Sequence, residues 1–221
     1  MAQLFVGLSG AYKQVTGSGY NTYGEDLNRP HWQGAEIGLL DTFADMWGAV
    51  GETEYYEWVM GAHHPLYKEG GPAWCRFLDP DPAVRAQALE TAVTAAQTAH
   101  HVGCRYILFH FPWPGFHCTG HPYEAKMLDY GAPSLADLPS EQAVYEASRK
   151  VFARMAEVQA KEKIRIIFEL DGPNPYFYES DLFERLFGEF PDLSLCIDTG
   201  RLALLARMHG QDPLALTRRW L

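Results

Sequence analysis

Two carboxylates and two imidazoles occupy corresponding places in four apolar segments of this chain. Glu169 stands near the end of one segment, and Asp198 ends the next, 29 residues later. In two earlier segments the same place is held by His110 and by His63 or its neighbour His64. Carboxylates and imidazoles that converge from rigid strands suit a divalent metal of the Mn, Mg, Co or Zn range. Each residue alone could instead be a separately hydrogen-bonded polar group, but the repetition on four segments favours a shared site.

The segments that carry these residues are predicted to be strands of a parallel sheet. Their apolar runs lack polar alternation, which is typical of strands that helices cover on both faces. The carboxyl edge of such a sheet is where α/β folds place their chemistry. The predicted strands are Gln3–Ser9, Ala35–Leu40, Glu57–His63, Cys104–Phe111, Ile164–Leu170 and Leu193–Asp198.

Helices are predicted between the strands, in the alternating order of an α/β protein. The clearest one has Asp81 as its N-cap and Pro82 at its first position, and it ends at Gly103. The long connection from Pro112 to Pro139 is expected to be a lid or binding loop, and the tyrosine-rich segment 176–178 is expected to be a loop. The other predicted helices follow Ser140, cover Leu182–Phe187, and fill Leu202–Leu221 with a break near Gly210 and Pro213.

Composition and charge narrow the class of protein. At 221 residues and 47% hydrophobic content, the chain has enough apolar mass for one core, so a single domain over residues 1–221 is expected. The formal net charge of −10 argues against a protein that clamps phosphate backbones. The first ten residues lack a basic leader, no run reaches the roughly 18 apolar residues of a membrane span, and the four cysteines form no Cys-x-x-Cys pair. We therefore expect a cytoplasmic protein with reduced thiols and no membrane partner.

Four short sequence pieces, in this order, resemble the xylose isomerase-like TIM-barrel superfamily. They are Gly61-Ala62-His63-His64-Pro65, Ile107-Leu108-Phe109-His110, Ile167-Phe168-Glu169-Leu170 and Cys196-Ile197-Asp198-Thr199-Gly200. The superfamily contains sugar phosphate isomerases and epimerases, inosose dehydratase-like enzymes and the apurinic endonuclease of family two. The resemblance implies that Glu169 and Asp198 are metal ligands, that Glu169 and His110 are catalytic, and that His63 and His110 contact the substrate or the metal.

Two features depart from the superfamily pattern. Many members continue the sixth strand as Asp-x-x-His, whereas Arg201 holds the place of that histidine here. A guanidinium neither ligates a metal nor accepts a proton, so Arg201 is expected to bind a substrate anion or hydroxyl. The remaining superfamily ligands come from two further strands, and only 23 residues follow Asp198 in this sequence. We expect a TIM-barrel type fold with about six of eight βα units, lacking the last two strands.

Three explanations of that shortness stay open: a truncated chain, a lineage that lost its metal, or two unnoticed strands near Tyr12–Gln33. An unclosed barrel leaves two strand edges exposed, so a homo-oligomer is expected. The predicted function is a metal-dependent sugar or sugar-phosphate isomerase or epimerase that acts through an enediolate on a small carbohydrate. The alternatives are a catalytically silent binding or interaction protein of the same fold and, disfavoured by the acidic charge, an apurinic endonuclease-like enzyme acting on nucleic acid.

Overall fold

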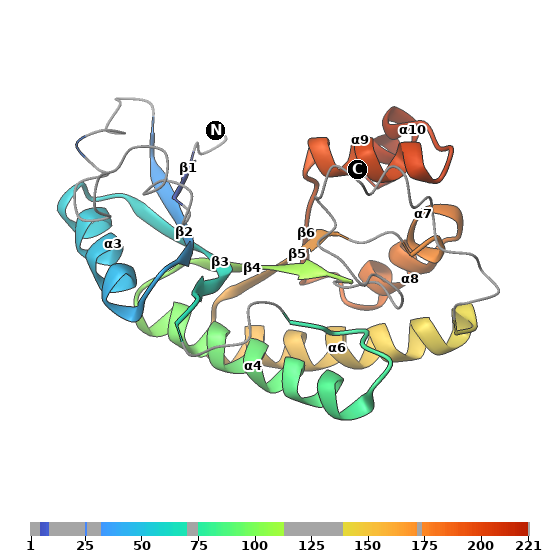
Figure 1. Cartoon of the computed structure of the whole chain (residues 1–221), viewed down its shortest axis with the longest axis horizontal. Coiled ribbons are helices and arrows are strands. Elements are labelled where there is room, and N and C mark those ends of the chain that lie inside the picture. The colour runs from blue at the N-terminus through green and yellow to red at the C-terminus, as the bar shows by residue number, and fades with distance from the viewer. Residues whose placement is uncertain are drawn as a thin grey trace. The chain divides into compact units, whose positions relative to one another are not determined.

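A computed structural model describes residues 5–8, 25, 32–69, 75–112, 139–171 and 174–220. Its six described strands are hydrogen-bonded neighbours in chain order, and the paired registers are parallel. The elements are β1 Phe5–Leu8, β2 Gly34–Leu40, α3 Phe43–Tyr55, β3 Val59–Tyr67, α4 Pro82–His101, β4 Tyr106–Phe111, α6 Glu141–Glu162, β5 Arg165–Leu170, α7 Tyr176–Glu179, α8 Leu182–Glu189, β6 Ser194–Cys196, α9 Thr199–Met208 and α10 Pro213–Trp220 (Figure 1).

Two compact units make up the fold. The first lies within residues 1–74, 91–109 and 158–166, and the second within residues 75–90, 110–157 and 167–221. Strands β4 and β5 each begin in the first unit and end in the second, so the carboxyl ends of both strands belong to the second unit.

In the first unit, helix α3 contacts β2 and β3. Thr42 begins the helix with a capping box: its hydroxyl accepts from the Asp45 amide at 3.1 Å, and the Asp45 carboxylate accepts from the Thr42 amide at 3.1 Å. The buried face of the helix carries Met46, Ala49 and Val50. The cap and the apolar stripe together explain why this short segment is helical.

A row of three residues crosses β2, β3 and β4 of the first unit. Gly61 of β3 is in register with Glu36 of β2, and the hydroxyl of Tyr106 on β4 donates to Glu36 Oε2 at 2.7 Å. A Cβ at residue 61 would lie 2.1 Å from the Tyr106 ring. Glycine at that position is therefore required for the phenol to reach across β3 to the carboxyl group.

The second unit has an aromatic core. Phe152 of α6 stacks on Phe168 of β5 with ring centroids 4.6 Å apart, and Phe111 of β4 contacts both rings at 5.2 Å. Phe77 and Phe177 extend the cluster, and all five side chains are fully buried. Aromatic pairs of this kind add stability beyond the area they bury, so the ends of β4 and β5 are fixed firmly against α6.

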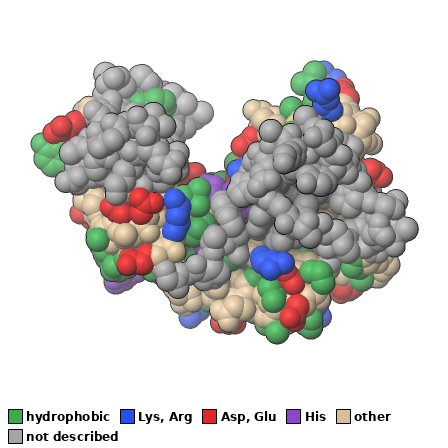
Figure 2. Space-filling view, viewed as in Figure 1, with side chains coloured by type: hydrophobic (Ala, Val, Ile, Leu, Met, Phe, Trp, Pro, Cys, Tyr) green, Lys and Arg blue, Asp and Glu red, His purple; other side chains and the backbone are tan. Residues whose placement is uncertain are grey.

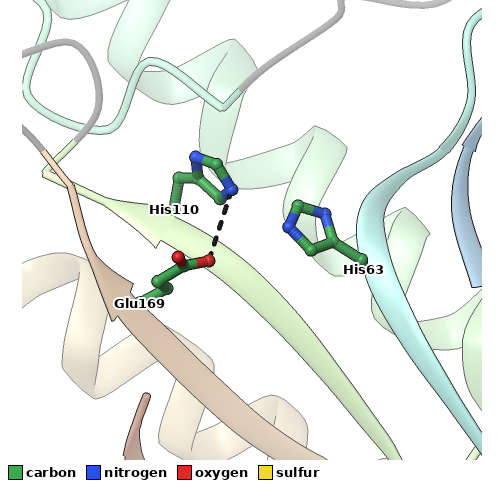
Figure 3. A group of neighbouring side chains, drawn as sticks. All are labelled: His63, His110 and Glu169. Atoms are coloured by element: carbon green, nitrogen blue, oxygen red, sulfur yellow. Dashed lines mark ion pairs between the residues drawn. The ribbon is translucent and has the colours of Figure 1, made fainter. Parts of the chain in front are cut away.

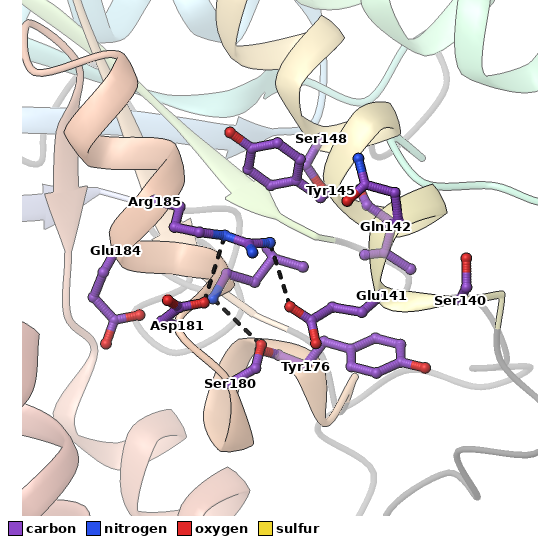
Figure 4. A network of polar contacts seen from close by, with 12 residues as sticks. Ser140, Glu141, Gln142, Tyr145, Ser148, Tyr176, Ser180, Asp181, Glu184 and Arg185 are labelled. Atoms are coloured by element: carbon purple, nitrogen blue, oxygen red, sulfur yellow. Dashed lines mark hydrogen bonds and ion pairs between the residues drawn. The ribbon is translucent and has the colours of Figure 1, made fainter.

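Ion pairs on the surface of the second unit connect α6 with α8 (Figure 4). Arg185 of α8 pairs with Glu141 of α6 at 3.3 Å, and its guanidinium lies 4.5 Å from the ring centroid of Tyr145. The hydroxyl of Tyr145 donates to Glu189 at 2.9 Å. These groups are solvent-exposed, so each pair contributes little and the aromatic core decides the packing.

Most of the predicted elements are confirmed. The helix that starts at Pro82 has the expected cap, since the Asp81 carboxylate accepts from the Ala83 amide at 2.8 Å, and Gly103 follows its end with a φ of 88°. The break near residue 210 is confirmed between α9 and α10. Strand β3 continues past its predicted end to Tyr67, because a register shift brings Tyr67 opposite Leu40.

The prediction of a loop at residues 176–178 is wrong, because these residues open the short helix α7. The side chains of Phe177 and Tyr178 are buried, so core packing rather than helix propensity orders this turn. The predicted connection 112–139 and the segment 12–33 lie almost entirely outside the described residues. Among the described helices, none combines the length and apolar character that a membrane span requires.

Candidate active site

His110 and Glu169 lie side by side in the second unit (Figure 3). They come from the penultimate positions of β4 and β5, and their exposed fractions are 4% and 5%. Nε2 of His110 lies 3.4 Å from Oε2 of Glu169. A carboxylate and an imidazole this deeply buried need specific polar partners.

Asp171 is the partner of the other ring nitrogen, and the sequence interpretation missed it. Its side chain is fully buried, and Nδ1 of His110 donates to Oδ2 of Asp171 at 2.5 Å. The amide of Asp171 donates to the carbonyl of Phe111 at 2.7 Å, which continues the strand ladder one residue past the end of β5. The spacing of two residues from Glu169 was the available signal, because alternate residues of a strand share one face.

Arg201 of α9 brings a positive charge to the same side chains. Its Nη1 lies 2.8 Å from Oε1 of Glu169, 3.1 Å from Nε2 of His110 and 3.4 Å from Oδ2 of Asp171. Since Nδ1 of His110 donates to Asp171, Nε2 of a neutral ring is an acceptor. Nη1 lies as close to Nδ1 of His110, at 3.2 Å, as to Nε2, so the guanidinium faces the ring as a whole while it pairs with the Glu169 carboxylate.

Asp198 lies two residues beyond β6 and caps helix α9. Its Oδ1 accepts from the Arg201 amide at 2.9 Å, as an N-cap carboxylate does. Its Oδ2 lies 3.6 Å from Nε of Arg201, and the side chain is 40% exposed. Asp198 thus fixes the start of the helix that carries Arg201, and Arg201 contacts Glu169, His110 and Asp198 together.

His63 belongs to the first unit, on β3, and is also drawn in Figure 3. Its Nδ1 donates to the carbonyl of His64 at 2.9 Å. In the parallel registers of this unit it stands opposite Gly38 of β2 and Leu108 of β4. A Cβ at residue 38 would lie 2.5 Å from the carbonyl oxygen of His63, so glycine there allows β2 to approach the histidine closely.

The chemistry of these donors suits a divalent metal. His110 and Glu169 of the second unit and His63 of the first are side chains of the types that ligate such ions. Asp171 holds the His110 ring through Nδ1 and directs Nε2 toward Glu169, which is the carboxylate–histidine arrangement common around metals. Arg201 contacts the same two donors, so the described part of the second unit pairs a metal-type ligand set with a guanidinium.

Figure 2 shows one face of the molecule, where the described Lys and Arg side chains form separate spots among acidic and apolar groups. Affinity for a phosphate backbone needs a continuous basic stripe or patch. That the protein does not bind nucleic acid stays a prediction.

Solved structures share the fold. The chain aligns with the TTHB071 protein from Thermus thermophilus, soaked with ZnCl2, at 18% identity and a TM-score of 0.51, covering 90% of this chain and 66% of that one. It aligns with a sugar phosphate isomerase/epimerase from Parabacteroides distasonis at 15% identity and a TM-score of 0.53, covering 99% and 72%. It aligns with D-psicose 3-epimerase with D-tagatose from Clostridium cellulolyticum at 11% identity and a TM-score of 0.56, covering 94% of this chain and 71% of that one. The chain therefore spans about two thirds of the Thermus protein.

No curated protein matches the sequence closely enough to count as a relative. A family model described as xylose isomerase-like TIM barrel matches residues 28–218, which is most of the chain. The predicted resemblance and the predicted fold class, a partial TIM barrel with parallel strands and outer helices, are both confirmed. The chain belongs to the xylose isomerase-like TIM-barrel family.

Proposed function

We propose that the chain is a sugar or sugar-phosphate isomerase or epimerase that acts through an enediolate. The observation that carries this proposal is the buried group of Glu169, His110 and Asp171 at the ends of β4 and β5. Active sites of TIM-barrel enzymes lie at this end of the strands. Several structural neighbours are sugar epimerases or isomerases by name, which supports a small carbohydrate as the substrate class.

The described residues support a division of labour in proton transfer. Glu169 is the group we assign to removing a proton from the carbon beside the substrate carbonyl. His110 is the group we assign to taking a hydroxyl proton, at Nε2. Asp171 keeps the ring in the tautomer with Nδ1 protonated and stabilises the imidazolium that forms.

Glu169 and Asp198 are the residues we assign to a divalent metal of the Mn, Mg, Co or Zn range, and Nε2 of His110 stays available for the proton transfer. A bound metal would polarise the substrate carbonyl and stabilise the negative charge of the enediolate. We further propose that His63 and Arg201 bind substrate oxygens. A cytoplasmic location, one domain and a homo-oligomer stay predictions.

The test is deuterium exchange at the carbon beside the carbonyl. Purified protein is incubated in D₂O with Mn²⁺ and, separately, D-tagatose, D-fructose and fructose 6-phosphate, and the loss of the proton signal is followed by NMR. Glu169→Gln should slow the exchange at least about 100-fold, and Asp171→Asn about 10- to 100-fold. Glu157→Gln is the matched control, because Glu157 is an exposed carboxylate of α6. If the wild-type protein exchanges no proton of any of these sugars in the presence of Mn²⁺, the proposed activity is refuted.

A second candidate function is a catalytically silent carbohydrate-binding or interaction protein. The contacts of Arg201 favour it, because a guanidinium beside Glu169 neutralises the carboxylate and covers the His110 ring. This candidate predicts that sugars raise the melting temperature while deuterium exchange stays absent. An exchange signal that requires Glu169 rules it out.

A further inference from the structure

Arg201 contacts both carboxylates that the proposed function assigns to a metal. Its Nη1 lies 2.8 Å from Oε1 of Glu169, and its Nε lies 3.6 Å from Oδ2 of Asp198. A metal ion held by these two carboxylates would take the place of the guanidinium, because two positive groups this close repel each other.

The charges around the site explain why a cation is needed there. The carboxylates of Glu169, Asp171 and Asp198 lie within 2.8, 3.4 and 3.6 Å of Arg201 nitrogens. Glu169 and Asp171 are almost fully buried, so their charges are weakly screened by water. Without a positive partner, these carboxylates would repel one another strongly, and Arg201 supplies that partner.

The attachment of Arg201 makes its guanidinium removable. Its backbone amide is fixed by Oδ1 of Asp198 at 2.9 Å, independently of where the side chain points. The side chain is 19% exposed, which leaves a route to solvent, and arginine has several rotatable bonds. The guanidinium can leave the carboxylates without unwinding the start of α9.

We propose that Arg201 is a built-in cation that holds the donor set in the absence of metal, and that a divalent ion binds by displacing its guanidinium. This inference rests on the metal assignment of the proposed function. Arg201 then sets the metal affinity: if the guanidinium leaves the carboxylates about one hundredth of the time, the apparent affinity falls about 100-fold. Once displaced, the Arg201 guanidinium can donate two hydrogen bonds to an oxygen of the substrate.

The test measures Mn²⁺ binding without any sugar. Free Mn²⁺ is titrated with protein and followed by its electron paramagnetic resonance signal, for the wild type and for Arg201→Gln. The variant should bind Mn²⁺ about 100-fold more tightly. Arg207→Gln, an exposed arginine of the same helix, should leave the affinity unchanged. Arg201→Lys keeps the positive charge, on a single nitrogen, and its affinity for Mn²⁺ should lie between those of the wild type and Arg201→Gln.

A second readout is the melting temperature, measured in EDTA and in Mn²⁺. Arg201→Gln should melt below the wild type in EDTA, and Mn²⁺ should raise its melting temperature more than that of the wild type. If Arg201→Gln binds Mn²⁺ no better than the wild type while Glu169→Gln loses binding, the displacement is wrong and the metal assignment survives. If neither the wild type nor Arg201→Gln binds millimolar Mn²⁺, the displacement and the metal assignment are both wrong. The proposed activity is then tested by the deuterium exchange alone.

Discussion

Two carboxyl groups on strands, Glu36 of β2 and Glu169 of β5, have opposite kinds of partner. Glu36 in the first unit accepts a hydrogen bond from the neutral phenol of Tyr106. Glu169 in the second unit faces the guanidinium of Arg201 at 2.8 Å. Burial raises the pKa of the Glu36 carboxyl above its ordinary value, and the Tyr106 hydrogen bond offsets only part of that shift.

The difference shows that the partner, more than the depth of burial, decides what a carboxyl group can do. A carboxyl group with a neutral donor is biased toward its protonated form and acts as a fixed polar link between strands. A carboxylate beside a guanidinium stays charged, and a charged oxygen is what a metal ion or a proton transfer needs. The second unit is therefore the place to search for chemistry, and four substitutions test this view.

The largest effect is expected from Arg201→Met, measured by urea denaturation in EDTA. Loss of the guanidinium leaves the buried Glu169 carboxylate without its cation and should lower the free energy of unfolding by about 3 kcal/mol. The double variant with Glu169→Gln should recover most of that loss, because the uncompensated charge is then absent. A loss below roughly 0.5 kcal/mol would match an ordinary surface pair and refute the comparison.

Gly61→Ala should have the next largest effect, through the first unit. Its new Cβ would lie 2.1 Å from the Tyr106 ring, so the ring must move away from Glu36, at a cost of about 2 kcal/mol. Gly51→Ala is the control, since Gly51 lies in α3 with no atom within 4 Å of the added Cβ. That change should stabilise the protein by about 0.5–1 kcal/mol. If the two variants have the same melting temperature, the close approach of Tyr106 to Gly61 is unimportant for stability.

Tyr106→Phe removes the hydrogen bond to Glu36 and keeps the ring. The expected loss is about 1 kcal/mol in urea denaturation, because the carboxyl group can take up a proton when its donor is gone. The loss should thus stay smaller than that of Arg201→Met. A Tyr106→Phe loss equal to or larger than the Arg201→Met loss would reverse the comparison.

The smallest expected effect is the pH dependence contributed by Glu36. Because its pKa is higher in the folded state than in the unfolded state, the folded state binds more protons above pH 4.5, and the free energy of unfolding falls as the pH rises through the folded pKa. Glu36→Gln should lack this fall, so its stability relative to the wild type should increase from pH 4.5 to pH 7. Parallel stability curves for the two proteins over this range would show that the pKa of Glu36 is not raised.

The sheet and the positions of Glu169 and His110 could be predicted because long apolar runs identify buried strands and their ends. Asp171 was within reach, since it shares a strand face with Glu169. The ion pair between Arg201 and Glu169 could not be predicted, because it depends on the direction in which helix α9 leaves Asp198 and on the rotamer of a long side chain. Helix α7 was missed because its four residues are ordered by the burial of Phe177 and Tyr178, which is a tertiary effect.

The Tyr106 ring that passes over Gly61 has a consequence for evolution. The close approach couples residue 61 to residue 106, and the hydrogen bond couples residue 106 to residue 36. A lineage that gains any side chain at residue 61 must lose the large ring at residue 106, and the carboxyl group at residue 36 then loses its donor. We expect the three positions to covary in descendants of this chain, with glycine, tyrosine and glutamate kept or replaced together.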